Sequence, residues 1–382
     1  MKLTKLFKEF FESEKSTGII LIGCTLISLV LANSAIGSNY IDIWQTQFSG
    51  HSIEQWINDG LMAIFFLLIG LELEREIYHG ELSKIKNATL PILAAIGGIA
   101  VPAAIYTAFN YGTPEQSGSG IPMATDIAFA LGILSLLGKR VPNALKVFLA
   151  ALAIIDDLGA IIIIAVFYTK TLMFTNLMYA LSIFAFLLIL NRLKVRNLIP
   201  YLVAGVFMWY FMLLSGVHAT IAGVLLAFAI PFGNGDEKST SYILQHFLHK
   251  PVSFVILPIF ALANTAILLS GDLGDILSHN YSLGIATGLI VGKPLGIFLA
   301  TFIGVKLGLG KLPSKVKWEH IFGVGLLGGI GFTMSIFITL LAFEDATIIN
   351  NSKLVILISS MLAGLLGFIT LRLTLREPKK KR

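Results

Sequence analysis

The chain has 382 residues, of which 56% are hydrophobic and only 13% are charged. Soluble domains carry about 25% charged residues, so this composition excludes a soluble globular protein and indicates one membrane unit over 1–382. The net charge of +6 does not point to a nucleic-acid partner, because the basic residues lie in the loops between apolar segments. Cys24 is the only cysteine, which excludes an intrachain disulfide. The sequence predicts no cofactor.

Twelve apolar segments predict an all-α polytopic membrane protein with about twelve transmembrane helices. The loops on one side hold 25 of the 28 lysine and arginine residues, the other side holds Lys170 and Lys353, and Lys293 lies inside a segment. Basic residues stay in the cytoplasm, so we expect both termini to be cytoplasmic. The segments are 17–33, 53–71, 88–109, 121–138, 143–168, 175–191, 198–213, 216–231, 251–269, 283–304, 319–343 and 353–375.

This count also gives the third and tenth segments opposite directions, so helices 3–5 and 10–12 form a predicted inverted repeat. The fourth segment follows a Gly/Ser-rich loop ending at Ile121-Pro122, and the eleventh carries five glycines between Gly323 and Gly331. Each interior glycine weakens a helix by roughly 1 kcal/mol relative to alanine. We therefore expect helices 4 and 11 to be interrupted, which predicts a transporter site near the midplane.

Asp156 and Asp157 lie side by side in the middle of an apolar run from Leu149 to Phe167. One carboxylate at that depth costs roughly 3 kcal/mol or more to insert, so snorkelling or helix capping is a poor explanation for a pair. Successive helix residues point about 100° apart, so one carboxylate can face a cavity while the other meets a neighbouring helix. We expect the pair to bind a cation, a proton or a fixed positive partner.

Two further polar positions lie within apolar segments. Thr125-Asp126 could cap the second half of an interrupted helix and compensate charge there, or Asp126 could ligate the ion. Lys293, followed by Pro294, could snorkel to an interface. Alternatively it could form a salt bridge to Asp156 or Asp157 that opens when the aspartate takes a proton. Of the two, we expect Asp156, when ionised, to be the partner.

Six motifs, in this order over nearly the whole chain, resemble the NhaA-type sodium/proton antiporters. That family is one of the transporters in which interrupted helices in inverted repeats are known to form the binding site. The inverted repeat predicted above is therefore not independent support for the resemblance. The motifs are Trp56-Ile57-Asn58-Asp59-Gly60-Leu61-Met62, Ala124-Thr125-Asp126-Ile127-Ala128-Phe129, Ile154-Ile155-Asp156-Asp157-Leu158-Gly159, Ser215-Gly216-Val217-His218-Ala219-Thr220, Gly292-Lys293-Pro294-Leu295-Gly296 and Gly328-Gly329-Ile330-Gly331-Phe332-Thr333-Met334-Ser335.

The resemblance implies roles for these residues. Asp156 and Asp157 would be the ion and proton site, with transported Na+ on their carboxylates, and Lys293 would be their partner. Asp126, with Thr125, would compensate charge where the interrupted helices cross. The resemblance also implies a homodimer in the bacterial inner membrane, with a β-hairpin from the loop at about 35–52 at the dimer contact. The expected division is a core bundle of 88–168 and 283–375 and a dimer or interface part of 1–87 and 169–282.

The resemblance also implies a cytoplasmic pH-responsive cluster. Glu72, Arg75, His218 and His246 match positions linked to pH response, although the histidines alone could be ordinary packing or interfacial residues. This chain departs from the pattern nearby, with Gln245 in place of a glutamate, Tyr242 and Ile243 in place of a basic pair, and Glu74 in place of a lysine. These departures make a different pH profile an expectation of the sequence.

The function expected is secondary, electrogenic and pH-regulated antiport. Sodium or lithium leaves in exchange for protons, by alternating access around the paired aspartates, with membrane lipid as surroundings. Two alternatives stay open at this point. An intramembrane aspartyl protease would need two facing aspartates, for which Asp126 and Asp156 could serve, but no Gly-x-Gly-Asp string surrounds either of them. The second alternative is a sodium-coupled symporter with a similar fold.

Overall fold

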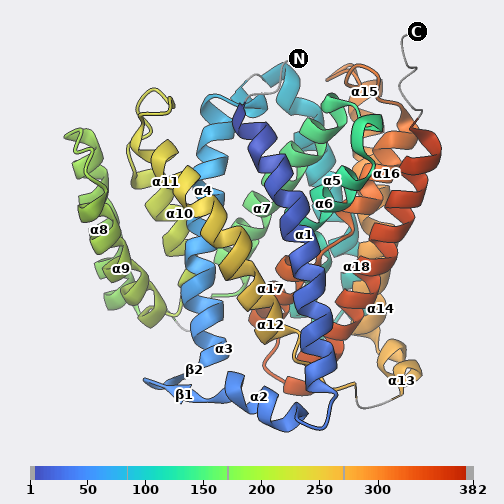
Figure 1. Ribbon diagram of the computed structural model, residues 1–382, viewed down its shortest axis with the longest axis horizontal. Helices are drawn as coiled ribbons and strands as arrows, with labels where there is room; N and C mark the ends of the chain where they lie inside the picture. Colours follow the sequence, from blue (N-terminus) through green and yellow to red (C-terminus); the bar gives the residue numbers. More distant parts are fainter. Residues whose placement is uncertain (1–4, 84, 170–171, 270–271, 376–382) are drawn as a thin grey trace. The chain divides into compact units, whose positions relative to one another are not determined.

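The computed structural model describes residues 5–83, 85–169, 172–269 and 272–375, and these are almost all helical (Figure 1). Several basic residues that entered the orientation argument lie outside the described residues: Lys2, Lys84, Lys170 and all of those after Leu375. The cytoplasmic placement of the two termini therefore stays a prediction.

Eight helical stretches within the described residues are long and apolar enough to cross a membrane, or up to ten if each of two bent helix pairs is one span. The other two predicted segments correspond to the shorter apolar helices Leu198–Leu214 and Thr220–Ala229. The all-α membrane fold is confirmed, whereas the count of twelve stays a prediction. The eight stretches are Ile53–Tyr78, Ala88–Asn110, Pro114–Leu136, Asn143–Phe167, Phe174–Arg192, Thr240–Asn264, Asn280–Lys306 and Ala346–Thr374.

The chain divides into two compact units. Unit 1 comprises Met1–Leu29, Lys84–Ala160 and Ile267–Arg382, and unit 2 comprises Val30–Ser83 and Ile161–Ala266. Of the described residues, 5–29 thus belong to unit 1. The expected division into a core bundle and a dimer part concerns which segments move and assemble, and it stays a prediction.

Unit 1 contains both members of the predicted inverted repeat. Its helices are α1 (Lys5–Ala32), which continues beyond Leu29, α5 (Ile85–Asn110), η3 (Pro114–Met123), α6 (Ile127–Leu136), η4 (Gly138–Arg140), α7 (Asn143–Phe167), which continues beyond Ala160, α13 (Leu273–Ser278), α14 (Asn280–Thr287), η6 (Gly288–Gly292), α15 (Lys293–Lys306), α16 (Trp318–Gly328), α17 (Phe332–Ala342) and α18 (Ala346–Thr374).

Close packing of α5 against α15 depends on two glycines. A Cβ atom on Gly97 would lie 2.2 Å from the carbonyl oxygen of Gly296, and one on Gly296 would lie 2.1 Å from that of Gly97. No larger residue fits at either position without moving the backbone, which explains how small residues let membrane helices approach. The same approach brings Lys293, at the start of α15, into the centre of unit 1.

Both interrupted spans are present, as the sequence predicts. In the fourth, the 3₁₀ helix η3 ends at Met123, residues 124–126 are extended, and α6 follows. In the eleventh, α16 and α17 are separated by residues 329–331 and meet at 47°. The backbone amide of Asp126 donates to the carbonyl of Ile330 (2.6 Å), so the two non-helical stretches pair where they cross. Unwound backbone is tolerated at this depth because protein covers it.

Unit 2 contains α2 (Gly37–Gln45), β1 (Gln47–Phe48), β2 (His51–Ser52), α3 (Ile53–Trp56), η1 (Ile57–Leu61), α4 (Met62–Tyr78), η2 (Glu81–Ser83), α8 (Phe174–Arg192), α9 (Leu198–Leu214), α10 (Thr220–Ala229), α11 (Thr240–Pro251), η5 (Val252–Ile256) and α12 (Leu257–Asn264). Helices α4 and α10 pack closely, since a Cβ on Gly223 would lie 2.1 Å from the carbonyl oxygen of Ala63.

The expected β-hairpin forms, but it is shorter than the loop assigned to it. Strands β1 and β2 pair antiparallel, with Gln47 opposite Ser52 and Phe48 opposite His51. Ser49 (φ 52°) and Gly50 (φ 86°) make the two-residue turn with left-handed backbone that suits such hairpins. Residues 37–45, which the sequence analysis placed in the hairpin loop, form helix α2 instead.

Candidate functional site

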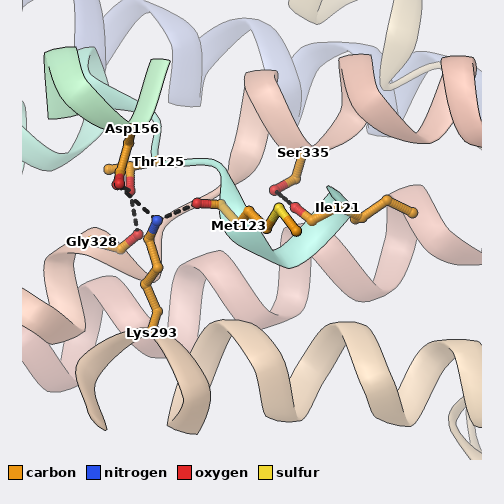
Figure 2. Close-up of polar contacts among 7 residues, drawn as sticks. All are labelled: Ile121, Met123, Thr125, Asp156, Lys293, Gly328 and Ser335. Atoms are coloured by element: carbon orange, nitrogen blue, oxygen red, sulfur yellow. Dashed lines mark hydrogen bonds and ion pairs between the residues drawn. The ribbon is translucent and has the colours of Figure 1, made fainter. Parts of the chain in front are cut away.

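A buried ion pair lies at the centre of unit 1. The Nζ atom of Lys293 is 2.7 Å from Oδ2 of Asp156, and both side chains are 0% exposed. Nζ also donates to the carbonyl oxygen of Met123, the last residue of η3 (Figure 2). Of the two aspartates, the sequence analysis predicted Asp156, when ionised, as the partner of Lys293, and in this structure Lys293 meets Asp156.

Local backbone features place Lys293 at this point. It follows the π-helical turn η6 directly, and Pro294 cannot donate the helix hydrogen bond that its position requires. A Cβ on Gly98 of α5 would lie 2.9 Å from Cγ1 of Ile297 and 3.7 Å from Nζ of Lys293. Glycine at position 98 therefore leaves room for Ile297, one turn after Lys293, between α5 and α15.

The Thr125 hydroxyl connects Asp156 to the other interrupted span. Its Oγ1 lies 2.7 Å from Oδ2 of Asp156 and 2.8 Å from the carbonyl oxygen of Gly328, the last residue of α16 (Figure 2). A hydroxyl has a single proton to donate. If Asp156 is ionised, the hydroxyl can donate to only one of these two oxygens. If Asp156 is protonated, it can donate to Thr125, which in turn donates to Gly328.

Asp126 caps two half-helices at once. Its Oδ1 accepts from the backbone N–H of Phe129 in α6 (2.9 Å). Its Oδ2 accepts from the backbone N–H of Thr333 in α17 (3.1 Å) and from the Thr333 hydroxyl (2.6 Å). Helix N-termini carry partial positive charge. One buried carboxylate, 2% exposed, therefore meets the positive ends of both α6 and α17.

The opposite ends of the interrupted spans meet hydrogen-bond donors. The carbonyl of Met123 ends η3 and accepts from Lys293, and the carbonyl of Gly328 ends α16 next to the Thr125 hydroxyl. Carbonyls at helix C-termini carry partial negative charge. At the crossing, the negative helix C-termini thus meet the donors Lys293 and Thr125, and the positive helix N-termini meet the carboxylate of Asp126.

Asp157 is also buried, at 1% exposed, beside Asp156 on α7. The two side chains point about 100° apart around the helix, so Asp157 faces a different neighbourhood. No cluster of three or more His, Cys, Asp or Glu side chains that could hold a metal ion occurs among the described residues. The order of importance of the two aspartates as sodium ligands stays a prediction.

Two serine contacts at the crossing were not predicted. The Ser335 hydroxyl donates to the carbonyl of Ile121 (2.7 Å, Figure 2), and the Ser360 hydroxyl accepts from the backbone N–H of Phe332 (3.1 Å). Ser335 is the last residue of the sixth motif of the sequence analysis, and its place there could have indicated a contact at the crossing. Ser360 lies in an apolar stretch of α18 with no sequence signal beyond its polarity.

The residues expected to respond to pH lie in unit 2. Arg75 of α4 donates to the Oε1 atom of Gln245 (3.3 Å) and to the carbonyl oxygen of Gly235 (3.5 Å). Its guanidinium carbon lies 4.7 Å from the ring centroid of Tyr242. The ring of His246 stacks on the same Tyr242 ring, with 6.2 Å between the centroids. Two of the four residues that depart from the family pattern, Tyr242 and Gln245, thus contact Arg75.

Glu72 and His218 do not share those contacts. Glu72 is buried, at 7% exposed, three residues before Arg75 on α4. His218 lies just before α10 begins, and its Nε2 atom is 2.9 Å from the carbonyl oxygen of Tyr168. The charges of Glu72 and Arg75 interact, His246 is linked to Arg75 through Tyr242, and the role of all four predicted pH residues stays a prediction.

These features define a class of protein: a multi-pass membrane transporter with a buried charged site at two crossed, interrupted helices. A family model described as Na+/H+ antiporter 1 matches residues 8–371. The chain belongs to this family, which consists of secondary transporters and not enzymes, so the protease alternative is wrong.

Curated relatives agree over almost the full length. The "Na(+)/H(+) antiporter NhaA" of Flavobacterium psychrophilum is 70% identical over 377 residues, which are 99% of this chain and 98% of the relative. "Na(+)/H(+) antiporter NhaA 1" of Flavobacterium johnsoniae is 64% identical, covering 99% of this chain and 100% of the relative. The NhaA of Dechloromonas aromatica is 61% identical, covering 97% and 96%. Each of these names describes an exchange of sodium for protons.

Proposed function

We propose that this protein exports Na+ or Li+ in exchange for protons, with Asp156 and Asp157 as the shared site of cation and proton. The observation that carries the proposal is the fully buried Asp156–Lys293 pair at the crossing of two interrupted spans. A buried charge without a partner is strongly unfavourable, so whatever separates this pair must supply new partners. A proton on Asp156, or a cation beside it, does so.

Counting charges links the two aspartates to electrogenic exchange. Two ionised carboxylates and one ammonium give the site a net charge of about −1, which one Na+ neutralises. If both carboxylates return protonated, the site carries about +1 with Lys293 charged. One sodium then leaves for two protons and one net charge crosses the membrane. A single titrating group would make the exchange electroneutral, so electrogenic transport requires a second one, and we propose that the two groups are the two aspartates.

Thr125 couples the charge of Asp156 to the interrupted eleventh span. Protonation of Asp156 lets the carboxyl donate to Thr125 and frees the hydroxyl proton for the carbonyl of Gly328, so both contacts form together. Deprotonation leaves the hydroxyl between two acceptors. The protonation state of the site therefore changes how firmly α16 is held, which is a physical basis for alternating access.

Asp126 is proposed to compensate charge and not to bind the ion. Its two oxygens already accept three hydrogen bonds from Phe129 and Thr333. Those donors belong to helix ends that keep their partial positive charge throughout a cycle. Sodium ligation by Asp126 would require giving up these contacts.

The pH response is proposed to involve Glu72, Arg75, His218 and His246. In this chain Arg75 is held by an amide, a backbone carbonyl and an aromatic ring, and the amide at 245 has no proton to exchange where a glutamate would have one. Part of the cluster is therefore insensitive to pH. We expect activity to rise with pH less steeply than in a chain with a glutamate at 245.

The setting is proposed to be the bacterial inner membrane, with both termini cytoplasmic. The hairpin at 47–52 within the loop 35–52 is proposed to join two protomers into a homodimer. The exposed Phe48 side chain, 70% exposed, and the free edges of a two-stranded sheet favour pairing with a second copy.

The deciding experiment is reconstitution of the purified protein in vesicles that contain a pH-sensitive dye. Imposed sodium or lithium gradients should drive proton flux with no organic substrate present, and clamping the membrane potential should change the rate. Proton flux that needs an organic solute would support the symporter alternative. An unchanged rate under the clamp would leave antiport intact but refute electrogenic exchange.

A further inference from the structure

The end of α15 and the loop from α15 to α16 bring exposed apolar, aromatic and basic side chains together. We propose that they form a binding site for one anionic phospholipid of the surrounding bilayer. The proposal concerns unit 1 alone and does not depend on which residues carry sodium.

An apolar stripe on α15 and the preceding turn provides the surface for the acyl chains. Val291, Leu295, Leu299, Ile303 and Leu307 are 45%, 39%, 46%, 54% and 68% exposed. Residues four apart lie on one face of a helix, so these five form a continuous ridge. From Val291 to Leu307 the ridge is about 24 Å long at 1.5 Å per residue, which is more than half of a bilayer's hydrocarbon thickness.

An aromatic cluster lies next to the end of this ridge. Phe298 and Phe302 stack at 6.3 Å, and Trp318 meets their ring edges at 5.7 and 5.3 Å. Phe322 packs on Phe298 at 6.1 Å. Tryptophan is typical of the level at which headgroups begin. Ile303 and Leu307 continue the ridge beyond Phe302, so the cluster marks the level at which a lipid on the ridge approaches its headgroup.

Basic side chains follow immediately beyond the aromatic cluster. The stretch 306–319 contains four lysines and a single acidic residue, Glu319. Lys306, Lys311, Lys315 and Lys317 are all exposed, and Nζ of Lys306 lies 4.9 Å from the ring centroid of Phe302. Ammonium groups at the headgroup level attract phosphate and prefer lipids with net negative charge.

The loop that presents these lysines has a defined conformation. The Lys317 backbone N–H donates to Nδ1 of His320 (3.1 Å), and the buried His320 ring lies with Nε2 3.5 Å from the carbonyl oxygen of Thr374 in α18. Lys315 has φ 66°, a left-handed conformation that glycine or asparagine adopts more easily. The charges are therefore held near the ridge by an ordered loop and not by a free tail.

The test uses the emission of Trp318 as a reporter inside the site. Full-length protein is placed in phosphatidylcholine vesicles with a minor fraction of phosphatidylglycerol, and bromine atoms are carried on the acyl chains of either lipid. Subtracting the quenching of the Trp318→Phe variant isolates the Trp318 signal. We expect brominated phosphatidylglycerol to quench about tenfold more than its share of the bilayer predicts.

Matched variants decide whether the loop lysines cause this enrichment. Lys311→Gln, Lys315→Gln and Lys317→Gln together should remove it, whereas Arg192→Gln, Lys194→Gln and Arg196→Gln, which neutralise a different loop, should not. The same three loop lysines changed to arginine should keep the enrichment and control for folding. Quenching equal to the bulk lipid fraction, or enrichment that survives the triple glutamine variant, would overturn the proposal. Sodium flux is measured separately and has no bearing on this outcome.

Discussion

The Asp126→Asn substitution tests whether one carboxylate neutralises two helix ends. The asparagine side chain has one acceptor oxygen and one amide group, so it can satisfy the N–H of Phe129 or the two donors of Thr333, but not both. A buried donor left without an acceptor costs about 1–3 kcal/mol. Loss of the negative charge at two helix N-termini adds roughly 0.3–1 kcal/mol for each. We expect the free energy of unfolding to fall by about 2–4 kcal/mol.

The measurement combines unfolding in detergent micelles with calorimetric titration of sodium. Asp345→Asn is the matched control, because Asp345 caps only α18, accepting from Thr347 (2.7 Å) and Ile348 (3.0 Å) at the surface. It should have the smaller effect on unfolding and none on sodium binding. Asp126→Asn should weaken sodium binding but retain it. Loss of all sodium binding in a folded variant would show that Asp126 is a ligand, and the reasoning would be wrong.

Three further predictions address the rest of the site. Asp157→Asn should abolish sodium-dependent proton flux in vesicles while the unfolding transition is retained; normal flux in a folded variant would contradict its role as main ligand. Lys293→Met should destabilise the protein by about 3–5 kcal/mol, because it leaves Asp156 buried and unpaired, and adding Asp156→Asn should recover most of that loss in a double-mutant cycle. Additive losses would mean that the pair is not energetically coupled. Gln245→Glu should make activation with pH steeper, since a carboxylate beside Arg75 can change charge; superimposed pH profiles would remove position 245 from the sensor.

The sequence predicted the interruptions of the two spans because their causes are local. Glycines at 329 and 331 and a proline at 122 weaken the helices where they stand, and Thr125-Asp126 before an apolar run is a recognisable N-cap. The need of Lys293 for a partner also followed from burial alone. These inferences depend on residues close together in the chain or on the cost of burying a charge.

Contacts between distant segments could not be predicted in the same way. Lys293 meets the carbonyl of Met123, 170 positions earlier, and Thr125 meets that of Gly328, 203 positions later. Backbone carbonyls carry no sequence signal. The departures at Tyr242 and Gln245 were noticed as losses of charge. Only the structure shows that both side chains contact Arg75, so that the loss of charge came with replacement contacts.

The contrast between Asp126 and Asp156 supports the proposal that these two buried carboxylates in one unit have different functions. Two of the three hydrogen bonds to Asp126 come from backbone N–H groups, and backbone donors at a helix end cannot move away without unwinding the helix. The contacts of Asp156 are to the side chains of Lys293 and Thr125, which can rotate. A proton or a sodium ion can therefore take the place of partners at Asp156 at little conformational cost, whereas at Asp126 it would have to displace the ends of two helices. A transport site needs partners that can be exchanged, and at this crossing Asp156 has them.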